Sequence, residues 1–294
     1  MALEPISYQE RGVKIMKWKV KTLIFVLLAI LALQAPMTSQ AAKKVRKSSA
    51  TVKMERLEKK VSKYIKSSCP ISANGQKAST AWSVYVKDLK TKKSFTINKK
   101  SFFSASTIKL YAMAAAYDKA KKGKLAMNSS IESLINSMIT VSSNDAFNTL
   151  FYKYLGKGTV NKFCKANGYK KTQQYRPCGV GDESGPKGNK TSAADCGMLL
   201  EKIYRGKMVS RAASQKMLNY LKRQTIRTKI PRGVPYGIQV ANKTGEDGTI
   251  QNDVAIVYGK KTTYIICVFS NTNNPGRAYN CIAEISRMVY NALN

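Results

Sequence analysis

A serine and a lysine stand three residues apart where a helical pattern begins. Ser106 and Lys109 open an alanine-rich stretch that Gly123 ends. Because positions i and i+3 share one face of a helix, the hydroxyl and the amine can meet. Free backbone N–H groups at the N-terminus of a helix can stabilise an oxyanion. Burial and a nearby cation lower the pKa of an amine, which lets a lysine act as a base. The pair predicts a serine nucleophile activated by lysine; an ordinary helix cap beside a solvated lysine is the alternative.

The absence of histidine favours such a pair. None of the 294 residues is histidine, which excludes Ser-His-Asp and Cys-His hydrolases, His-ligated zinc enzymes and His-ligated haem. Six widely spaced cysteines without a C-x-x-C pair also argue against a four-cysteine zinc site. Proton transfer at neutral pH is therefore left to Lys, Glu, Asp, Tyr or Cys, and we expect neither a metal nor an organic cofactor.

Two further motifs follow in order along the chain. Ser142-Ser143-Asn144 continues as Asp-Ala-Phe-Asn, and Lys243-Thr244-Gly245, which is the only K-T-G, closes a predicted strand before Asn-Asp-Val-Ala at 252–255. The ordered set S-x-x-K, S-x-N and K-T-G is the signature of serine penicillin-recognising enzymes. On these motifs, residues 82–292 resemble the class A β-lactamase-like serine hydrolases.

The resemblance implies a role for each matching residue. Ser106 would attack an activated amide carbonyl and form an acyl-enzyme, while Lys109 removes its proton directly or through water. Ser142 would relay a proton to the departing amine. Substrate binding would fall to Asn144, which also holds Lys109, and to Lys243, Thr244, Gly245 and Glu246, with the backbone N–H groups of Ser106 and Glu246 as the oxyanion donors.

The sequence departs from the family pattern at two places. Ser143 stands where the family usually has Asp, a position that supports local structure more than chemistry. The family's E-x-x-L-N segment, whose glutamate activates the deacylating water, does not occur between the second and third motifs. In the long loop 173–190, Glu183 could replace that base or could be an exposed acid. Acylation of Ser106 is therefore better supported than efficient hydrolysis of the acyl-enzyme.

The periodicity of the chain predicts an α+β fold. Strands are expected at 81–89, 94–98, 236–243, 253–258 and 262–270, and helices at 52–66, 106–121 and 277–293. Capping-box patterns at Ser129 and Ser192 mark two further helix starts. We expect a five-stranded antiparallel sheet built from both chain ends and flanked by helices, with an inserted all-helical subdomain at about 124–230. The enzyme domain would span 81–294, after a basic lead-in and helix at 43–80.

The N-terminal sequence has the features of an export signal. Four lysines from Lys14 to Lys21 precede the apolar run Leu23–Leu33, and Ser39-Gln40-Ala41 is a plausible cleavage site. Residues 1–42 are therefore expected to be a signal peptide, with an uncleaved membrane anchor as the alternative. The predicted location is secreted or associated with the cell envelope.

The formal net charge of +35 is spread along the whole chain. Without an RNA-reading motif or zinc-finger spacing, we expect no nucleic-acid partner. An anionic cell wall or membrane surface could attract the charge nonspecifically, or the charge could simply solvate the surface. The small-molecule partner would be a β-lactam or a substrate derived from peptidoglycan.

The cysteines leave two possibilities open. An even number in an exported chain permits up to three disulfides, and we expect one local bridge among Cys164, Cys178 and Cys196. Six buried thiols are the alternative, because a domain of this size folds without disulfides.

Three functions fit these observations. The first is an exported serine hydrolase that β-lactams or related amides acylate at Ser106, with hydrolysis of the acyl-enzyme. The second is a D,D-peptidase or penicillin-binding protein that acts on peptidoglycan. The third is a non-catalytic relative that binds the cell wall.

Overall fold

The computed structural model describes residues 48–179 and 188–294. The predicted signal peptide and Glu183 lie outside these residues. Within them, no helix has the length and apolarity that a membrane span requires.

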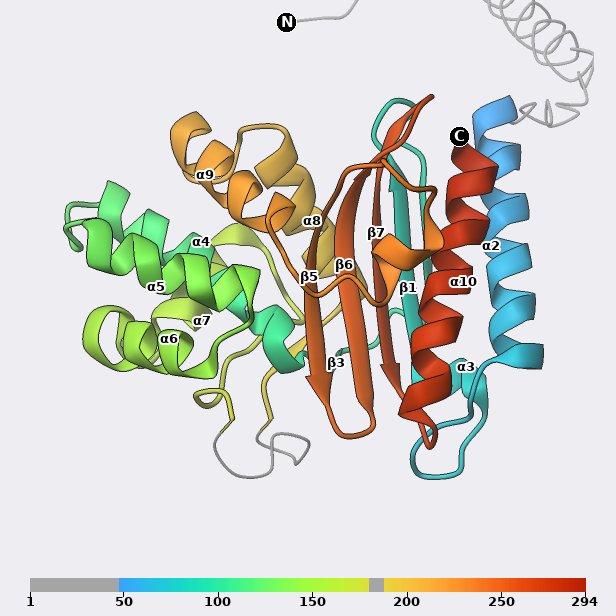
Figure 1. The fold of residues 1–294 in the computed structure, drawn as a ribbon, viewed down its shortest axis with the longest axis horizontal. Coiled ribbons are helices and arrows are strands. Elements are labelled where there is room, and N and C mark those ends of the chain that lie inside the picture. Colours follow the sequence, from blue (N-terminus) through green and yellow to red (C-terminus); the bar gives the residue numbers. More distant parts are fainter. Residues whose placement is uncertain (1–47, 180–187) are drawn as a thin grey trace, which may run out of the picture. The chain divides into compact units, whose positions relative to one another are not determined.

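The centre of the fold is an antiparallel sheet of five strands in the order β2-β1-β7-β6-β5 (Figure 1). The strands are β1 Trp82–Asp88, β2 Ser94–Ile97, β5 Val240–Asp247, β6 Ile250–Tyr258 and β7 Thr263–Asn271. Strand β1 pairs with β7 along its whole length, from Trp82 opposite Ser270 to Asp88 opposite Tyr264. The two ends of the chain therefore build one sheet, which confirms the predicted fold class.

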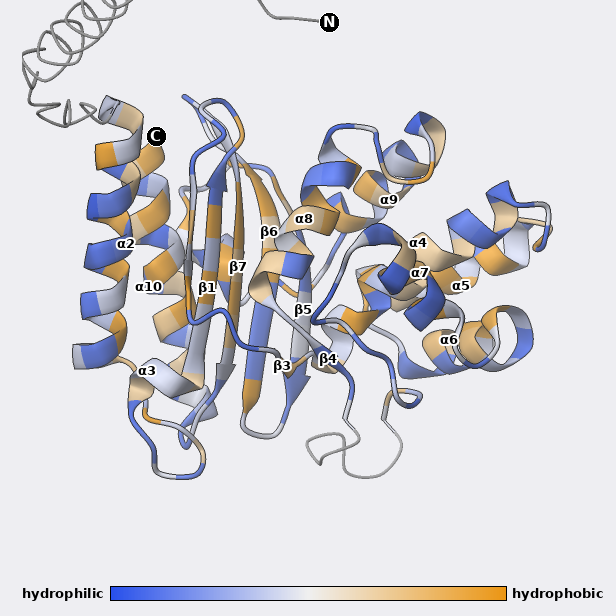
Figure 2. Ribbon diagram, turned by 180° about the vertical axis from the view of Figure 1, so that it is seen from behind, coloured by the Kyte–Doolittle hydropathy of each residue, from blue (hydrophilic) through white to orange (hydrophobic). Residues whose placement is uncertain are grey.

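Two helices cover one face of this sheet. Helix α2 (Ser49–Ser68) and helix α10 (Pro275–Leu293) lie side by side against the strands (Figure 1). Figure 2 shows their apolar sides turned inward and their hydrophilic sides outward. Met54, Leu57, Val61 and Ile65 recur at helical spacing on α2 and are all buried. These residues join the core that α10 and the sheet share.

The other face carries the helical region. Its helices are α4 Ile108–Lys121, α5 Ser129–Thr140, α6 Asn144–Thr149, α7 Thr159–Asn167, α8 Ala193–Tyr204 and α9 Arg211–Lys222. Helix α8 packs on the sheet, and α4 lies within the helical region. Helix α4 is buried on every side from Ile108 to Tyr117. Its alanines allow neighbouring helices to approach from all directions, so its N-terminus is held rigidly.

Smaller elements connect these layers. They are α3 Ala78–Ala81, the two-residue strands β3 Phe102–Phe103 and β4 Lys190–Thr191, 3-10 turns at Ala105–Thr107 and Ile230–Gly233, and a π-helical turn at Leu150–Leu155. Strand β3 pairs with β4 beside the sheet.

Several boundary predictions were wrong; strand β6, for example, begins at Ile250 and not at 253. Helix α5 is capped by Asn128, whose side chain accepts a hydrogen bond from the N–H of Ile131, so Ser129 lies inside the helix. Strand β5 begins at Val240 and runs to Asp247, so the K-T-G motif lies within the strand rather than at its end. The chain is still in a turn at Gly237, whose φ of +83° an extended strand does not permit.

The predicted disulfide among Cys164, Cys178 and Cys196 was also wrong. All six cysteines are free and buried. Burial raises the pKa of Cys164 and of Cys196 to about 12, so both remain neutral thiols. Their packing therefore matches the alternative of six buried thiols.

Candidate active site

The sheet fixes the start of helix α4, where Ser106 lies. The amide of Asn252 on β6 donates to the backbone carbonyls of Phe103, at 2.9 Å, and Ser104, at 3.2 Å. Ser106 follows in a 3-10 turn after Ala105, whose φ of +40° is unusual for a residue other than glycine. Such strain persists only where surrounding contacts impose it, and it is common at functional sites. The hydroxyl of Ser106 is thus placed at a helix start by contacts from the sheet.

Lys109 lies one helical turn further and is completely buried. Its Nζ lies 2.9 Å from Ser106 Oγ, as the i, i+3 spacing predicted. The same nitrogen donates to Asn144 Oδ1 at 2.6 Å and to the backbone carbonyl of Ser142 at 2.7 Å. Contacts with three oxygen atoms therefore fix the amine of Lys109 beside the hydroxyl of Ser106.

Ser142 bridges the two lysines of the motifs. It connects α5 to α6 with a φ of +61°, and its Oγ lies 2.8 Å from Lys243 Nζ and 3.5 Å from Lys109 Nζ. The next residue, Ser143, caps α6 by accepting a hydrogen bond from the N–H of Ala146. Serine fills the N-cap position as aspartate would, which gives the departure from the family pattern a structural explanation.

Lys243 is buried within strand β5 and donates to Ser142 Oγ and to its neighbour's carbonyl, that of Thr244, each at 2.8 Å. Burial, reinforced by the positive charge of Lys109, holds the pKa of Lys243 well below its usual value. Lys243 therefore gives up its proton more readily than a solvated lysine does.

Gly245 allows strand β5 to approach the nucleophile. A Cβ atom at this position would lie 2.7 Å from the carbonyl oxygen of Ser104 and 3.2 Å from the backbone nitrogen of Ser106. Any larger residue would push the strand away from the start of α4. The third motif thus contributes a close backbone contact as well as two polar side chains.

Two charged residues near the site were missed by the sequence interpretation. Lys229 is fully buried, and its Nζ forms an ion pair of 2.5 Å with Glu246 Oε1. Arg227 donates to the carbonyl of Val240 at 2.9 Å. Neither residue belongs to a motif, and no spacing in the sequence distinguishes them from the other basic residues.

Asp253 is a third charged group near the site, and the sequence showed it only as part of the flank of the third motif. It is buried and accepts hydrogen bonds from the amide of Asn242 and the N–H of Ile230. Burial raises the pKa of Asp253 to about 6, although Lys229 and Lys243 act against this shift.

The family model described as the beta-lactamase enzyme family matches residues 57–133 and 126–293. The chain belongs to the beta-lactamase enzyme family.

Solved structures agree with this assignment of the fold. PBP-A is 22% identical, and the match covers 81% of this chain and 95% of that chain with a TM-score of 0.70. A mutant of PBP-A, in an acyl-enzyme complex with penicillin-G, is 22% identical over 81% of this chain and 96% of that chain, with a TM-score of 0.71. A beta-lactamase from Chitinophaga pinensis is 22% identical over 81% of this chain and 100% of that chain, with a TM-score of 0.71. No curated protein sequence matches the chain.

A loop of this beta-lactamase family member lies against the second motif. Asn148 on α6 donates to the carbonyl of Cys178 at 2.9 Å and accepts from its N–H at 3.0 Å. A Cβ atom on Gly179 would lie 2.5 Å from the amide nitrogen of Asn144. Asn148 therefore holds the start of the long loop close to the residue that contacts Lys109. An asparagine four residues after Asn144 was part of the motif's flank, but its loop partner could not be read from the sequence.

The structure brings together eight of the nine predicted site residues of this family member. They are Ser106, Lys109, Ser142 and Asn144 from the helical region, and Lys243, Thr244, Gly245 and Glu246 from strand β5. The ninth, Glu183, lies outside the described residues. In the described parts of the chain, no three His, Cys, Asp or Glu side chains gather as a metal site would require.

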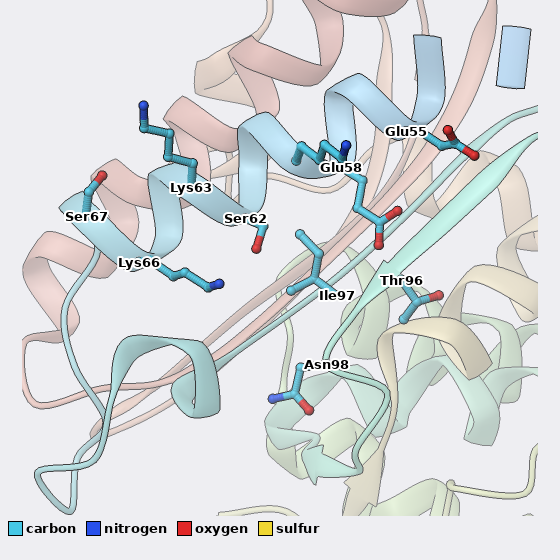
Figure 3. Close-up of a pocket in the computed structure, with 10 residues that line it drawn as sticks. Glu55, Glu58, Ser62, Lys63, Lys66, Ser67, Thr96, Ile97 and Asn98 are labelled. Carbon is cyan, nitrogen blue, oxygen red and sulfur yellow. The ribbon is translucent and has the colours of Figure 1, made fainter. Parts of the chain in front are cut away.

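A groove of about 980 Å³ lies elsewhere on the molecule, between helix α2 and the edge strand β2 (Figure 3). Its lining includes Glu58, Ser62, Lys66 and Asn98, and none of the motif residues. Glu55 and Glu58 lie toward one end of the groove and Lys63 and Lys66 toward the other, and no buried nucleophile lines it. The chemistry of the chain is therefore concentrated at the junction of α4 and β5, and not in this groove.

Proposed function

We propose that the protein is an active-site-serine hydrolase that β-lactams or related amides and esters acylate at Ser106. The observation that carries this proposal is the position of Lys109 Nζ, which is 2.9 Å from Ser106 Oγ and is held by Asn144 and Ser142. A buried amine in contact with a serine hydroxyl can serve as the base that histidine provides in other hydrolases. The PBP-A mutant in an acyl-enzyme complex with penicillin-G supports the same covalent step.

The proposed acylation uses the contacts described above. In its deprotonated form, Lys109 takes the proton of Ser106 as Oγ forms a bond with the substrate's carbonyl carbon. The carbon–nitrogen bond then breaks, and Ser142 gives its proton to the departing nitrogen. Lys109, which carries the proton taken from Ser106, returns a proton to Ser142 Oγ, and the hydrogen bond of Lys243 orients that oxygen. Water finally cleaves the ester, returning the acid and free Ser106; Glu183 is the proposed base for this step.

A fluorescent penicillin tests the covalent step. The full chain should acquire one label per molecule, and Ser106→Ala should acquire none. Ser62→Ala, a serine on helix α2, is the matched control and should be labelled like the wild type. Equal labelling of wild type and Ser106→Ala would overturn the proposal, and absence of label from both would favour the non-catalytic wall-binding relative.

The lifetime of the label distinguishes the two proposed enzymatic functions. Loss of label within minutes indicates hydrolysis of the acyl-enzyme, whereas a persistent label indicates a penicillin-binding protein or D,D-peptidase. Glu183→Gln should slow the loss of label without slowing its formation. Unchanged loss in this variant would exclude Glu183 as the base.

Export is part of the same proposal and rests on residues 1–42. When the full gene is expressed in a bacterium, the mature protein should begin at Ala42 or Lys43 after cleavage, which N-terminal sequencing would show. An intact N-terminus in the membrane fraction would indicate the anchor instead.

A further inference from the structure

Two cysteines lie where the end of helix α2 meets the start of helix α10. Cys69 is the residue at which α2 ends, and its N–H donates to the carbonyl of Ile65. Cys281 lies in the first half of α10. The two helices run side by side in opposite directions, so the last turn of one lies against the first turns of the other (Figure 1). Both cysteines belong to the buried core that these helices share with the sheet.

Three contacts hold the two side chains close to each other. Cys281 Sγ is 3.9 Å from the carbonyl oxygen of Ser68, which directly precedes Cys69. Arg277, one helical turn before Cys281, donates to the same oxygen at 2.8 Å. Tyr64 on α2 donates its hydroxyl proton to Cys281 Sγ across 3.7 Å. Because a peptide oxygen lies about 3 Å from the next Cα atom, Cys69 Cα is within about 7 Å of Cys281 Sγ.

The two thiols of this pair differ in acidity. A hydrogen bond from Cys69, with smaller contributions from Tyr64 and the charge of Arg277, lowers the pKa of Cys281 to about 7 against the effect of burial. The same hydrogen bond, together with burial, raises the pKa of Cys69. Cys281 is therefore the first of the two to become a thiolate, which is the form that attacks a disulfide.

Three other cysteines have the opposite character. Burial raises the pKa of Cys164, Cys196 and Cys267, so their thiols stay protonated at neutral pH. Protonated thiols are poor nucleophiles toward disulfides. Reactivity toward an oxidant is therefore expected at the junction of α2 and α10 rather than at these three positions.

We propose that Cys69 and Cys281 are a site of disulfide formation that fastens helix α2 to helix α10. This inference goes beyond the proposed function and does not depend on the reaction of Ser106. The oxidant is a small disulfide such as oxidised glutathione. The Cys281 thiolate attacks one of its sulfur atoms and displaces a glutathione thiolate, and the sulfur of Cys69 then attacks that of Cys281 and displaces the second one. Each leaving thiolate takes up one proton, so two protein thiols are oxidised as one glutathione disulfide is reduced to two thiols.

The expected consequence of this bridge is greater stability. The five-stranded sheet and the helices from α4 to α9 all lie between Cys69 and Cys281 in the sequence. A disulfide that closes so long a loop restricts the unfolded chain strongly and the folded chain little. The bridge would also join the first and the last helix that the structure describes.

Thiol counting on the full chain tests the proposal. The folded protein, and the protein refolding from urea, are incubated with oxidised glutathione, and the remaining thiols are then counted by mass after reaction with a maleimide in urea. We expect two of the six thiols to be lost and a peptide that joins Cys69 to Cys281. Retention of all six thiols after both treatments, or a bridge between other cysteines, would overturn the proposal.

Two serine substitutions separate this pair from the other thiols. Cys281→Ser should keep every remaining thiol after oxidation, whereas Cys164→Ser, the matched control at another buried cysteine, should lose two as the wild type does. Thermal unfolding gives a second measurement. The Tm of the oxidised wild type should exceed that of the reduced wild type by about 8 °C, and Cys281→Ser should show no such difference. Equal Tm values for the oxidised and reduced wild type would contradict the fastening of α2 to α10.

Discussion

Two completely buried lysines near the motif on strand β5 have different partners. Lys243 donates to a hydroxyl and a carbonyl, which are neutral acceptors, whereas Lys229 donates to the carboxylate of Glu246. The first arrangement leaves the pKa of the amine well below its usual value, which suits proton transfer. The second fixes a charge pair, which suits recognition or stability. The acceptor atoms, more than burial itself, separate these two uses of lysine.

Removal of the amine beside the nucleophile should have the largest effect. Lys109→Met is expected to slow acylation about 1,000-fold, because Lys109 is the base that contacts Ser106 Oγ. The measurement is the labelling rate with fluorescent penicillin, normalised to folded protein by circular dichroism. Lys229→Met is the matched substitution in the ion pair and should change that rate less than about 10-fold. Equal losses of labelling rate in Lys109→Met and Lys229→Met would show that the two lysines do not differ in their role in acylation.

Asp253, which interacts electrostatically with both Lys229 and Lys243, should make the free energy of unfolding depend on pH. Its pKa is raised by burial to about 6, so the folded state binds a proton more readily than the unfolded state. The stabilisation from this proton is complete below about pH 4 and is lost as pH rises through about 6, a change of about 3 kcal/mol. Urea unfolding of the wild type and of Asp253→Asn from pH 4 to 7 measures this change in stability.

The difference in unfolding free energy between these two proteins should fall with rising pH across that window. Subtracting the variant removes the contribution of other carboxyl groups, several of which have lowered pKa values and the opposite slope. A difference that stays constant with pH would show that Asp253 is already ionised in the folded protein at pH 4.

The ion pair of Lys229 should contribute moderately to stability. Lys229→Met is expected to cost about 2 kcal/mol, below the value for a fully buried pair because the Glu246 side chain is 36% exposed. Addition of Glu246→Gln should recover part of that loss, since the unpaired carboxylate is then gone. Thermal and urea unfolding of the single and double variants form the test, and a double variant less stable than the sum of both single losses would contradict it.

The smallest effect is expected at Ser143. Ser143→Asp introduces the residue that the family usually has, and both side chains cap a helix equally well. We expect stability within about 0.5 kcal/mol and acylation within about 2-fold of wild type. Ser143→Ala is the comparison that removes the cap and should cost about 1 kcal/mol. A strong effect of the aspartate on acylation would give this position a chemical role.

The sequence was informative where a short spacing imposes geometry. One helical turn brings Lys109 to Ser106, and alternation along an extended chain aligns Thr244 with Glu246; both follow from local periodicity. The sheet from both chain ends could be predicted because strands with alternating or continuous apolar residues are concentrated there.

Contacts between distant segments could not be predicted in this way. Lys229 is one of many lysines, and only the folded chain places it against Glu246 and Tyr279. The hydrogen bond from Asn252 to the carbonyl of Ser104 likewise joins residues that are remote in sequence. The thiols of Cys164 and Cys196 were close enough in sequence to suggest a bridge, but both are free and buried, and Cys196 is in contact with the hydroxyls of Tyr111 and Thr191.

The last strand of the chain occupies the interior of the sheet, between β1 and β6. Its Ser270 donates its N–H to the side chain of Asn252, which in turn holds the segment before Ser106. A nascent chain that has not yet released β7 from the ribosome cannot complete this arrangement. The nucleophile is therefore positioned only after β7 has been synthesised, and the many contacts between distant segments imply slow folding relative to a helical protein of equal length.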